Sequence, residues 1–195
     1  MISHFHRVSI SMKGLAREDV QIRLAELADL HKCVAIDASF VTDHVWQMDG
    51  SETDWEVSTV FRKVRLPRAM NVSYPRDLSS LFDDWRLEEC FVVAVDVDSV
   101  VGYLDMTVQK WNLTGWINHI VVHQDLRRKG IGTSLLRAAG IWARDNGLRK
   151  IMAETQTKNY PAISFYQKNA YRFCGFNDQH FTNQDIALFF VLNIR

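Results

Sequence analysis

The stretch from Ile120 to Leu136 carries the clearest chemistry in the sequence. It consists of an apolar strand, a basic turn with two glycines, and the first turns of an amphipathic helix. The first N–H groups of a helix have no partner inside the helix, and with the helix dipole they attract anions. Gly130 and Gly132 carry no Cβ, so a phosphate could approach the backbone there. The stretch predicts a pyrophosphate-binding loop.

The side chains of this loop add positive charge through Arg127, Arg128 and Lys129. Two better-known phosphate loops do not fit. A P-loop needs a closing Gly-Lys-Ser/Thr string, which is absent, and a dinucleotide fingerprint needs a third glycine where this chain has Leu135. On these residues alone, an ordinary glycine-containing turn before a helix remains an alternative.

Two motifs at the expected distance from each other support the phosphate loop. Residues 127–132 fit the pattern Arg/Gln-x-x-Gly-x-Gly/Ala, and residues 159–171 fit Asn-x-x-Ala followed by Phe-Tyr-x-Lys. Together they resemble the acetyl-CoA-binding motif of the GNAT N-acetyltransferase superfamily. The resemblance implies an α/β acyl-CoA N-acyltransferase fold, with a mixed, mostly antiparallel central sheet flanked by helices. It also implies acetyl-CoA as cosubstrate and no metal.

The resemblance assigns acetyl-CoA binding to three segments. Backbone N–H groups of the loop would hold the pyrophosphate, the preceding strand end would pair with the pantetheine arm and support an oxyanion, and the later helix would contact the arm. The predicted cofactor-binding residues are Ile120, Val121, Val122, Arg127, Arg128, Lys129, Gly130, Ile131, Gly132, Thr133, Asn159, Ala162 and Phe165.

Three residues are predicted to be catalytic. Tyr166 matches the tyrosine that protonates the departing CoA thiolate in the superfamily, although a helical tyrosine can also simply fill the core. Glu154 and His119 are the candidates for the base that deprotonates the amine. Glu154 could instead form a structural salt bridge, and His119 could be a hydrogen-bonded strand histidine.

Further strings resemble a narrower group, the streptothricin acetyltransferases. They are Lys110-Trp-Asn112, Glu154-Thr-Gln156, residues 174–178 and residues 186–190. This similarity implies transfer of an acetyl group to a primary amine of a small molecule such as a streptothricin-like antibiotic. One departure concerns Asn118-His119, where those relatives tend to carry an acidic pair. A protein lysine or N-terminal acetyltransferase and a non-catalytic acyl-CoA sensor remain the alternatives.

The elements that must position these residues follow from periodicity and turn signals. Residues 68–90 are polar and irregular, and by resemblance they form the acceptor side. Trp46, Trp55 and Trp111 could line an acceptor pocket, but core packing is the favoured expectation for them. The predicted strands are 20–24, 55–66 (ending before Pro67), 91–95, 100–108, 115–122, 150–155, 172–176 and 186–192, and the predicted helices are 28–40, 131–145 and the segment after Asn159.

Composition limits the possible partners. The 195 residues predict an extension over 1–19 and a single acetyltransferase domain over 20–195. Lys plus Arg (23) balance Asp plus Glu (23), so neither nucleic acid nor a membrane surface is an expected partner. Three widely spaced cysteines, without a leader or a long apolar run, favour a cytoplasmic protein whose cysteines pack as small apolar residues. A homodimer is compatible with the superfamily resemblance.

Overall fold

The computed structural model describes residues 20–194, so the predicted extension over 1–19 lies outside it. The chain divides into two compact units. Unit 1 takes its described residues from Met1–Ala38, Arg76–Ala153 and Val191–Arg195, and unit 2 comprises Ser39–Pro75 and Glu154–Phe190. The boundary falls inside two strands, which therefore contribute residues to both units.

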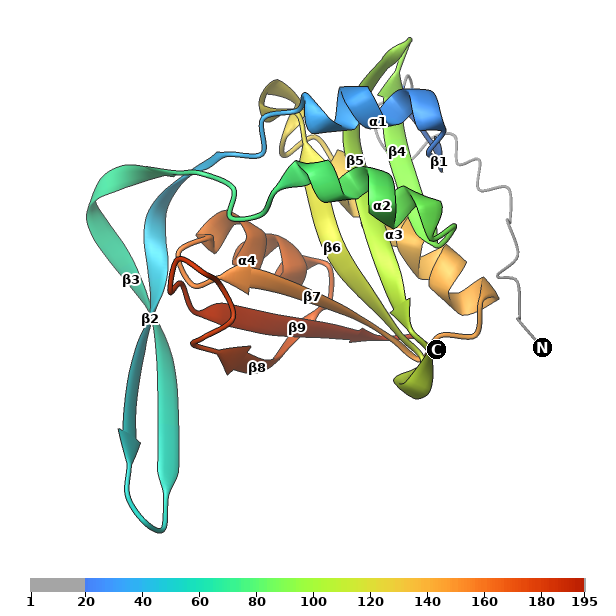
Figure 1. Ribbon diagram of the computed structural model, residues 1–195. Helices are drawn as coiled ribbons and strands as arrows, with labels where there is room; N and C mark the ends of the chain where they lie inside the picture. The colour runs from blue at the N-terminus through green and yellow to red at the C-terminus, as the bar shows by residue number, and fades with distance from the viewer. Residues whose placement is uncertain (1–19, 195) are drawn as a thin grey trace. The chain divides into compact units, whose positions relative to one another are not determined.

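The elements alternate between strands and short helices along the chain (Figure 1). The strands are β1 (Val20–Leu24), β2 (Phe40–Glu52), β3 (Val57–Val72), β4 (Cys90–Asp96), β5 (Ser99–Gln109), β6 (Thr114–Val122), β7 (Lys150–Gln156), β8 (Arg172–Asn177) and β9 (Ala187–Asn193). The helices are α1 (Leu27–Val34), α2 (Leu81–Arg86), α3 (Ile131–Asp145) and α4 (Tyr160–Lys168), with 3-10 turns at Leu78–Ser80, Lys110–Asn112 and Gln124–Leu126.

Seven strands form one sheet in the order β1-β4-β5-β6-β7-β9-β8, and β2 and β3 form a separate two-stranded sheet. The pairs β1–β4, β4–β5 and β5–β6 are antiparallel, whereas β6–β7 is parallel. A parallel neighbour requires a crossover, which α3 supplies between β6 and β7. The predicted α/β fold with a mixed, mostly antiparallel sheet is confirmed.

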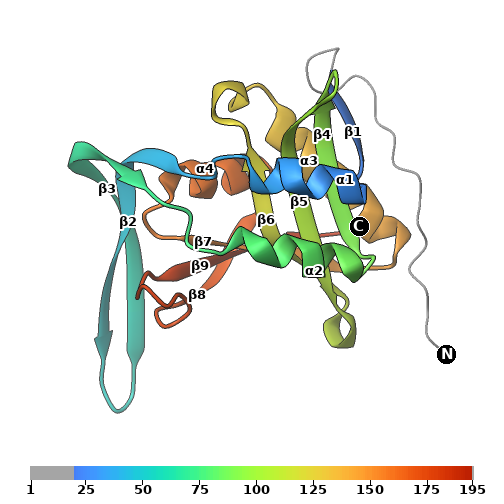
Figure 2. The same ribbon diagram turned by 45° about the horizontal axis from the view of Figure 1, so that its top comes forward.

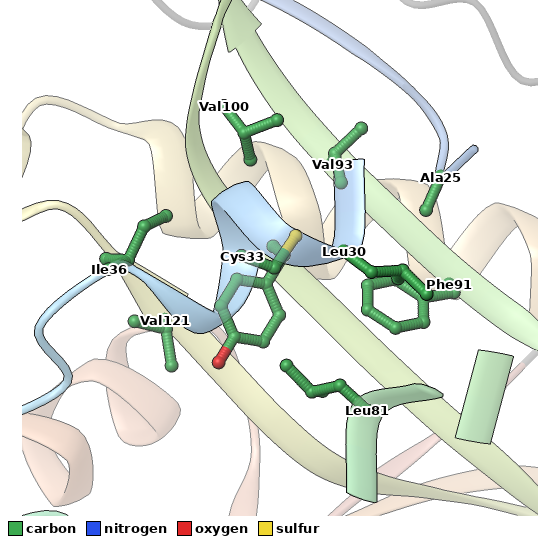
Figure 3. Packing of buried hydrophobic residues seen from close by; sticks show 10 residues of the cluster. Ala25, Leu30, Cys33, Ile36, Leu81, Phe91, Val93, Val100 and Val121 are labelled. Carbon is green, nitrogen blue, oxygen red and sulfur yellow. The ribbon is translucent and has the colours of Figure 1, made fainter. Parts of the chain in front are cut away.

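Unit 1 is built around the strands β4, β5 and β6. Helices α1 and α2 lie on one face of these strands and α3 lies on the other (Figures 1 and 2). Below α1 and α2 is a cluster of buried side chains that meet at the sheet (Figure 3). Its members are Ala25, Leu30, Cys33, Ile36, Leu81, Phe91, Val93, Val100, Tyr103 and Val121. This packing fixes β6, which leads directly into the predicted phosphate loop.

Helix α3 begins at the loop and buries one side against the sheet. Its buried residues include Leu135, Ala139 and Trp142, which recur at helical spacing as the sequence predicted. The helix ends at Asp145 with Asn146 as its C-cap, and Gly147 then adopts a positive φ of 71°. Glycine at that position fits a helix C-terminus, because no Cβ opposes the left-handed conformation.

Gly140 in the middle of α3 offers a stability prediction. A Cβ at this position would meet nothing within 4 Å. We expect Gly140→Ala to raise the free energy of unfolding by about 0.5–1 kcal/mol, because alanine loses less backbone entropy in a helix. Urea denaturation would measure the change. Gly147→Ala is the opposing control and should destabilise the chain, since its φ is positive.

Unit 2 corrects two predictions about the region before residue 75. The helix predicted over 28–40 ends at Val34, because Phe40 instead starts β2 and pairs with Val72 of β3. The strand predicted to end before Pro67 continues to Val72. Proline is tolerated there because the β2–β3 register skips Leu66–Ala69, so no ladder hydrogen bond is required of it.

Several side chains expected in the core lie elsewhere. Trp55 and Trp111 are 95% and 86% exposed, so the expectation that they fill the core is wrong. Trp46 is half-buried and packs near Phe61, with ring centroids 6.4 Å apart. Among the cysteines, Cys174 is exposed, whereas the other two are buried. No helix in the described part of the chain is long and apolar enough to span a membrane.

Candidate active site

The loop between β6 and α3 has the backbone that a phosphate cradle requires. A 3-10 turn over Gln124–Leu126 follows β6, and Arg128 then adopts a positive φ of 63°. Gly130 has φ 88° and ψ −12° and is the N-cap of α3. The helix begins at Ile131, so the N–H groups of its first turn face out of the helix start. Only glycine adopts the Gly130 conformation without strain.

Arg127 braces the loop with its guanidinium. Its Nε donates to the carbonyl of Val122 at 2.9 Å, and its Nη2 donates to the carbonyl of Asp37 at 2.9 Å. Burial lowers the pKa of Arg127, and the Asp37 carboxylate opposes this effect. Nearby, Lys129 Nζ donates to the carbonyl of Asp125 at 2.7 Å. These hydrogen bonds to backbone carbonyls fix the start of the loop. The backbone that carries its N–H groups is therefore held in place.

The strand before the loop keeps one edge available over its last residues. The parallel pairing of β6 with β7 ends at Ile117 and Ala153. Beyond that point, Ile120–Val122 pair with Leu104–Gly102 of β5, on the opposite edge. Within unit 1, this leaves the other edge of Ile120–Val122 suited to an extended ligand that pairs as a strand does.

A bulge in β6 places two polar side chains on one carboxylate. Asp105 of β5 lies opposite His119 and Met106 lies opposite Ile117, so Asn118 is an extra residue. His119 Nδ1 lies 2.9 Å from Asp105 Oδ1, and Asn118 Nδ2 donates to Asp105 Oδ2 at 3.1 Å. His119 and Asp105 are both 2% exposed. His119 is therefore a buried, carboxylate-oriented histidine, and the alternative of a hydrogen-bonded strand histidine describes its contacts.

Asp84 of α2 joins this pair. Burial, together with the nearby Asp105 charge, raises the pKa of Asp84. Ligand-type atoms of Asp84, Asp105 and His119 lie within 4.8 Å of one another, the one such group found among the described residues. Neither carboxylate was among the predicted site residues, although Asp105 stands out as a charged residue in an otherwise apolar run of β5.

The raised pKa of Asp84 gives a pH-dependent prediction. Because the folded-state pKa is raised, the stability linked to the protonated form is present below the ordinary pKa of about 3.9 and is lost as the pH rises through the folded value. Asp84→Asn keeps a donor for Asp105 and removes the charge. We expect it to raise Tm at pH 7 by about 1–2 °C, a modest effect because solvent screens a partly exposed group. Thermal melts should show the gain shrinking toward pH 4, and a constant gain would contradict the explanation.

The helix α4 of unit 2 carries the second predicted motif. Asn159 is its N-cap, and Asn159 Oδ1 accepts a hydrogen bond from the Ala162 N–H at 3.1 Å. Tyr166 is 3% exposed and stacks on Phe190 with centroids 5.7 Å apart. Tyr171 and Phe165 also pack against the Tyr166 ring, at 5.5 and 5.6 Å. The ring is therefore held in one orientation, with its phenol at a fixed place in unit 2.

Glu154 of β7 has a partner that was not among the predicted site residues. Its side chain is 4% exposed, and His180 Nε2 lies 2.8 Å from Glu154 Oε1. The His180 ring is supported edge-on by Phe181 and Phe189, with centroids 5.0 and 5.6 Å away. If Glu154 forms the structural salt bridge that was the predicted alternative, His180 is its partner. His180 lies 26 residues further along the chain, in a loop with no recognisable motif, so no local pattern points to it.

The predicted site residues fall into the two units. Unit 1 brings together the loop, the end of β6 and His119 with its two carboxylates. Unit 2 holds Glu154, Asn159, Ala162, Phe165 and Tyr166 on β7 and α4. Each unit thus holds its own set of predicted site residues on its helices, strands and loops.

Comparisons with known proteins agree with this arrangement. The sequence profile described as the Acetyltransferase (GNAT) family matches residues 58–171. A streptothricin acetyltransferase from Escherichia coli is 32% identical over 137 residues, which cover 70% of this chain and 70% of that protein.

Solved structures show the same fold. The crystal structure of a nourseothricin acetyltransferase superposes with a TM-score of 0.78 at 21% identity, covering 91% of this chain and 99% of the other. A putative streptothricin acetyltransferase from Bacillus anthracis str. Ames, in complex with acetyl coenzyme A, gives a TM-score of 0.69 at 23% identity, covering 89% and 99%. These structures share the fold, and the profile match with the Escherichia coli relative shows that the chain belongs to the GNAT family and is an N-acetyltransferase.

Proposed function

We propose that this protein transfers an acetyl group directly from acetyl-CoA to a primary amine of a small, streptothricin-like molecule. The observation that carries the proposal is the left-handed Gly130 at the start of α3, directly after β6, in a chain 32% identical to a streptothricin acetyltransferase. Support for acetyl-CoA comes from the Bacillus anthracis relative, which was crystallised with it.

The residues of this chain suit such a reaction. Backbone N–H groups from Arg128 to Thr133 would hold the pyrophosphate, and the open edge of Ile120–Val122 would take the pantetheine arm. An N–H of this strand end would support the oxyanion of a tetrahedral intermediate. Tyr166, held by three aromatic neighbours, would protonate the thiolate that leaves.

The carboxylates around His119 support a cationic acceptor. Relatives tend to carry an acidic pair where this chain has Asn118-His119, a departure that weakens the match at the sequence level. The fold places Asp105 and Asp84 beside these two residues, on β5 and α2. Two carboxylates in one place favour an ammonium group. The acceptor region of this chain therefore retains acidic character, supplied by different elements.

An acetyl-CoA turnover screen tests the proposal. Release of CoA thiol would be followed with streptothricin, aminoglycosides, polyamines, lysine peptides and peptides with free N-termini. Fast release with streptothricin or a related small amine supports the proposal, whereas turnover confined to peptides supports a protein acetyltransferase. Tight acetyl-CoA binding without release across the panel would identify a sensor.

The base is assigned by comparing two variants. We infer that Glu154 takes the proton, because its nearly buried carboxylate lies 2.8 Å from His180 Nε2, whereas His119 is already engaged by Asp105. We expect Glu154→Gln to lower kcat by about 100-fold or more with little change in the KM for acetyl-CoA. His119→Gln, which can keep a hydrogen bond to Asp105, should cost less than Glu154→Gln. The reverse order would make His119 the base.

A further inference from the structure

The β2–β3 hairpin of unit 2 gathers exposed apolar side chains on one element. Trp55 in its turn is 95% exposed, Val57 is 73% exposed, and Val60 and Val64 of β3 are also exposed. The hairpin is a long two-stranded ribbon whose turn end lies away from α4 in both views (Figures 1 and 2). Exposed apolar side chains concentrated in this way mark an interaction surface.

One edge of the hairpin is open to a further strand. Val57–Arg65 of β3 pair regularly with β2, a run of about 30 Å at 3.3 Å per residue. In the described part of the chain, β3 pairs with β2 only, so its outer edge presents backbone donors and acceptors. The outer edge of β2 is partly used, because the Trp46 N–H donates to the Thr157 carbonyl at 2.8 Å. Two-stranded ribbons gain stability when more strands are added.

Charge is separated along the hairpin. The turn end carries acidic residues and no basic ones: Asp49, Glu52, Asp54 and Glu56. The strand beyond it carries basic residues and no acidic ones: Arg62, Lys63, Arg65 and Arg68. Asp49 and Arg62 form an ion pair across the hairpin, and Lys63 Nζ donates to the Tyr160 hydroxyl at 2.8 Å. The exposed edge thus has an acidic end and a basic end.

We propose that the outer edge of β3 pairs with the same edge of a second copy of this chain. An antiparallel, two-fold contact near Val60 brings the acidic turn of each copy onto the basic stretch of the other, and the same contact occurs twice. It covers Val57 and Val60 and produces a four-stranded ribbon in the order β2-β3-β3-β2. Basic residues on an edge discourage pairing with unrelated strands, whereas an edge with opposite charges at its two ends selects its own antiparallel copy.

Charge reversal at either end tests the interface. The full-length chain would be compared with a turn variant (Asp54→Lys with Glu56→Lys) and a strand variant (Arg65→Glu with Arg68→Glu) by sedimentation equilibrium over a concentration series. We expect a wild-type dimer, and about tenfold or greater weakening of its dissociation constant in each variant alone. Mixing the two variants should restore a heterodimer, because both charge contacts are then opposite in sign. Added salt should weaken the wild-type dimer.

Each alternative outcome overturns the proposal. A wild-type chain that stays monomeric at every concentration would show that the hairpin does not pair with a second copy. A dimer that persists unchanged in both variants would place the interface elsewhere. Weakening in both variants without rescue in the mixture would show that the charges act on folding, and circular dichroism melts of each variant would confirm it. All of these measurements are independent of acetyltransferase activity.

Discussion

Replacing Tyr166 with phenylalanine is expected to lower kcat by about 100- to 10,000-fold while acetyl-CoA binding stays unchanged. The variant removes one oxygen from a ring that is 3% exposed and stacked on Phe190, so the packing is retained and only the proposed proton donor is lost. Without that proton, the CoA thiolate must leave unprotonated. Stopped-flow thiol release and calorimetric acetyl-CoA binding would separate the chemical step from affinity.

Tyr171 provides the matched control for this prediction. It is 2% exposed and packs against the Tyr166 ring, so Tyr171→Phe removes a hydroxyl from the same aromatic cluster. We expect Tyr171→Phe to keep kcat within a few fold of the wild type. If both variants lose activity equally, the Tyr166 hydroxyl serves the packing of unit 2, and if neither does, another group protonates the thiolate.

Gly130→Val is expected to abolish measurable acetyl-CoA binding. Gly130 has φ 88°, which a β-branched residue adopts only with strain, and its missing Cβ leaves room at the start of α3. Valine would either fill the space proposed for the pyrophosphate or shift the loop that presents the N–H groups. We expect the dissociation constant for acetyl-CoA to rise by about 100-fold or more, which is about 2.7 kcal/mol. Isothermal titration calorimetry measures it.

Gly147→Val is the control that separates backbone strain from loss of the proposed pyrophosphate site. Gly147 lies just beyond the other end of α3 and also has a positive φ, 71°. A Cβ added there would have no heavy atom within 4 Å among the described residues. Both valine variants should lower Tm through backbone strain, but only Gly130→Val should lose acetyl-CoA affinity. Unchanged affinity in a folded Gly130→Val chain would refute the placement of the pyrophosphate.

The features predicted well from the sequence are those fixed by neighbouring residues. The loop after β6, the amphipathic α3 and the Asn159 cap of α4 depend on glycine freedom, helical periodicity and a side chain three residues from its partner. Each signal lies within one stretch of chain. The fold class followed from them and from the motif resemblance.

The features that were missed depend on residues distant in sequence. Asp105 and His119 meet only because β5 and β6 pair with a bulge, and Glu154 meets His180 across a loop of unit 2. The helix predicted over 28–40 had suitable local spacing, but its last predicted residue, Phe40, pairs with Val72 as part of a strand instead. The roles of the predicted site residues remain predictions. Local residue spacing does not reveal which distant side chains each of them contacts.

The extra residue in β6 adds a side chain without shifting the strand that leads into the loop. Ile117 and Ile120 are three residues apart, yet they pair with Met106 and Leu104, which are two apart. A deletion at Asn118 would restore regular alternation while His119–Val122 keep their partners on β5. It would remove the amide that donates to Asp105 Oδ2. The bulge therefore gives Asp105 a second donor without changing the register of Ile120–Val122, and the surroundings of His119 can change at residue 118 while the loop stays in place.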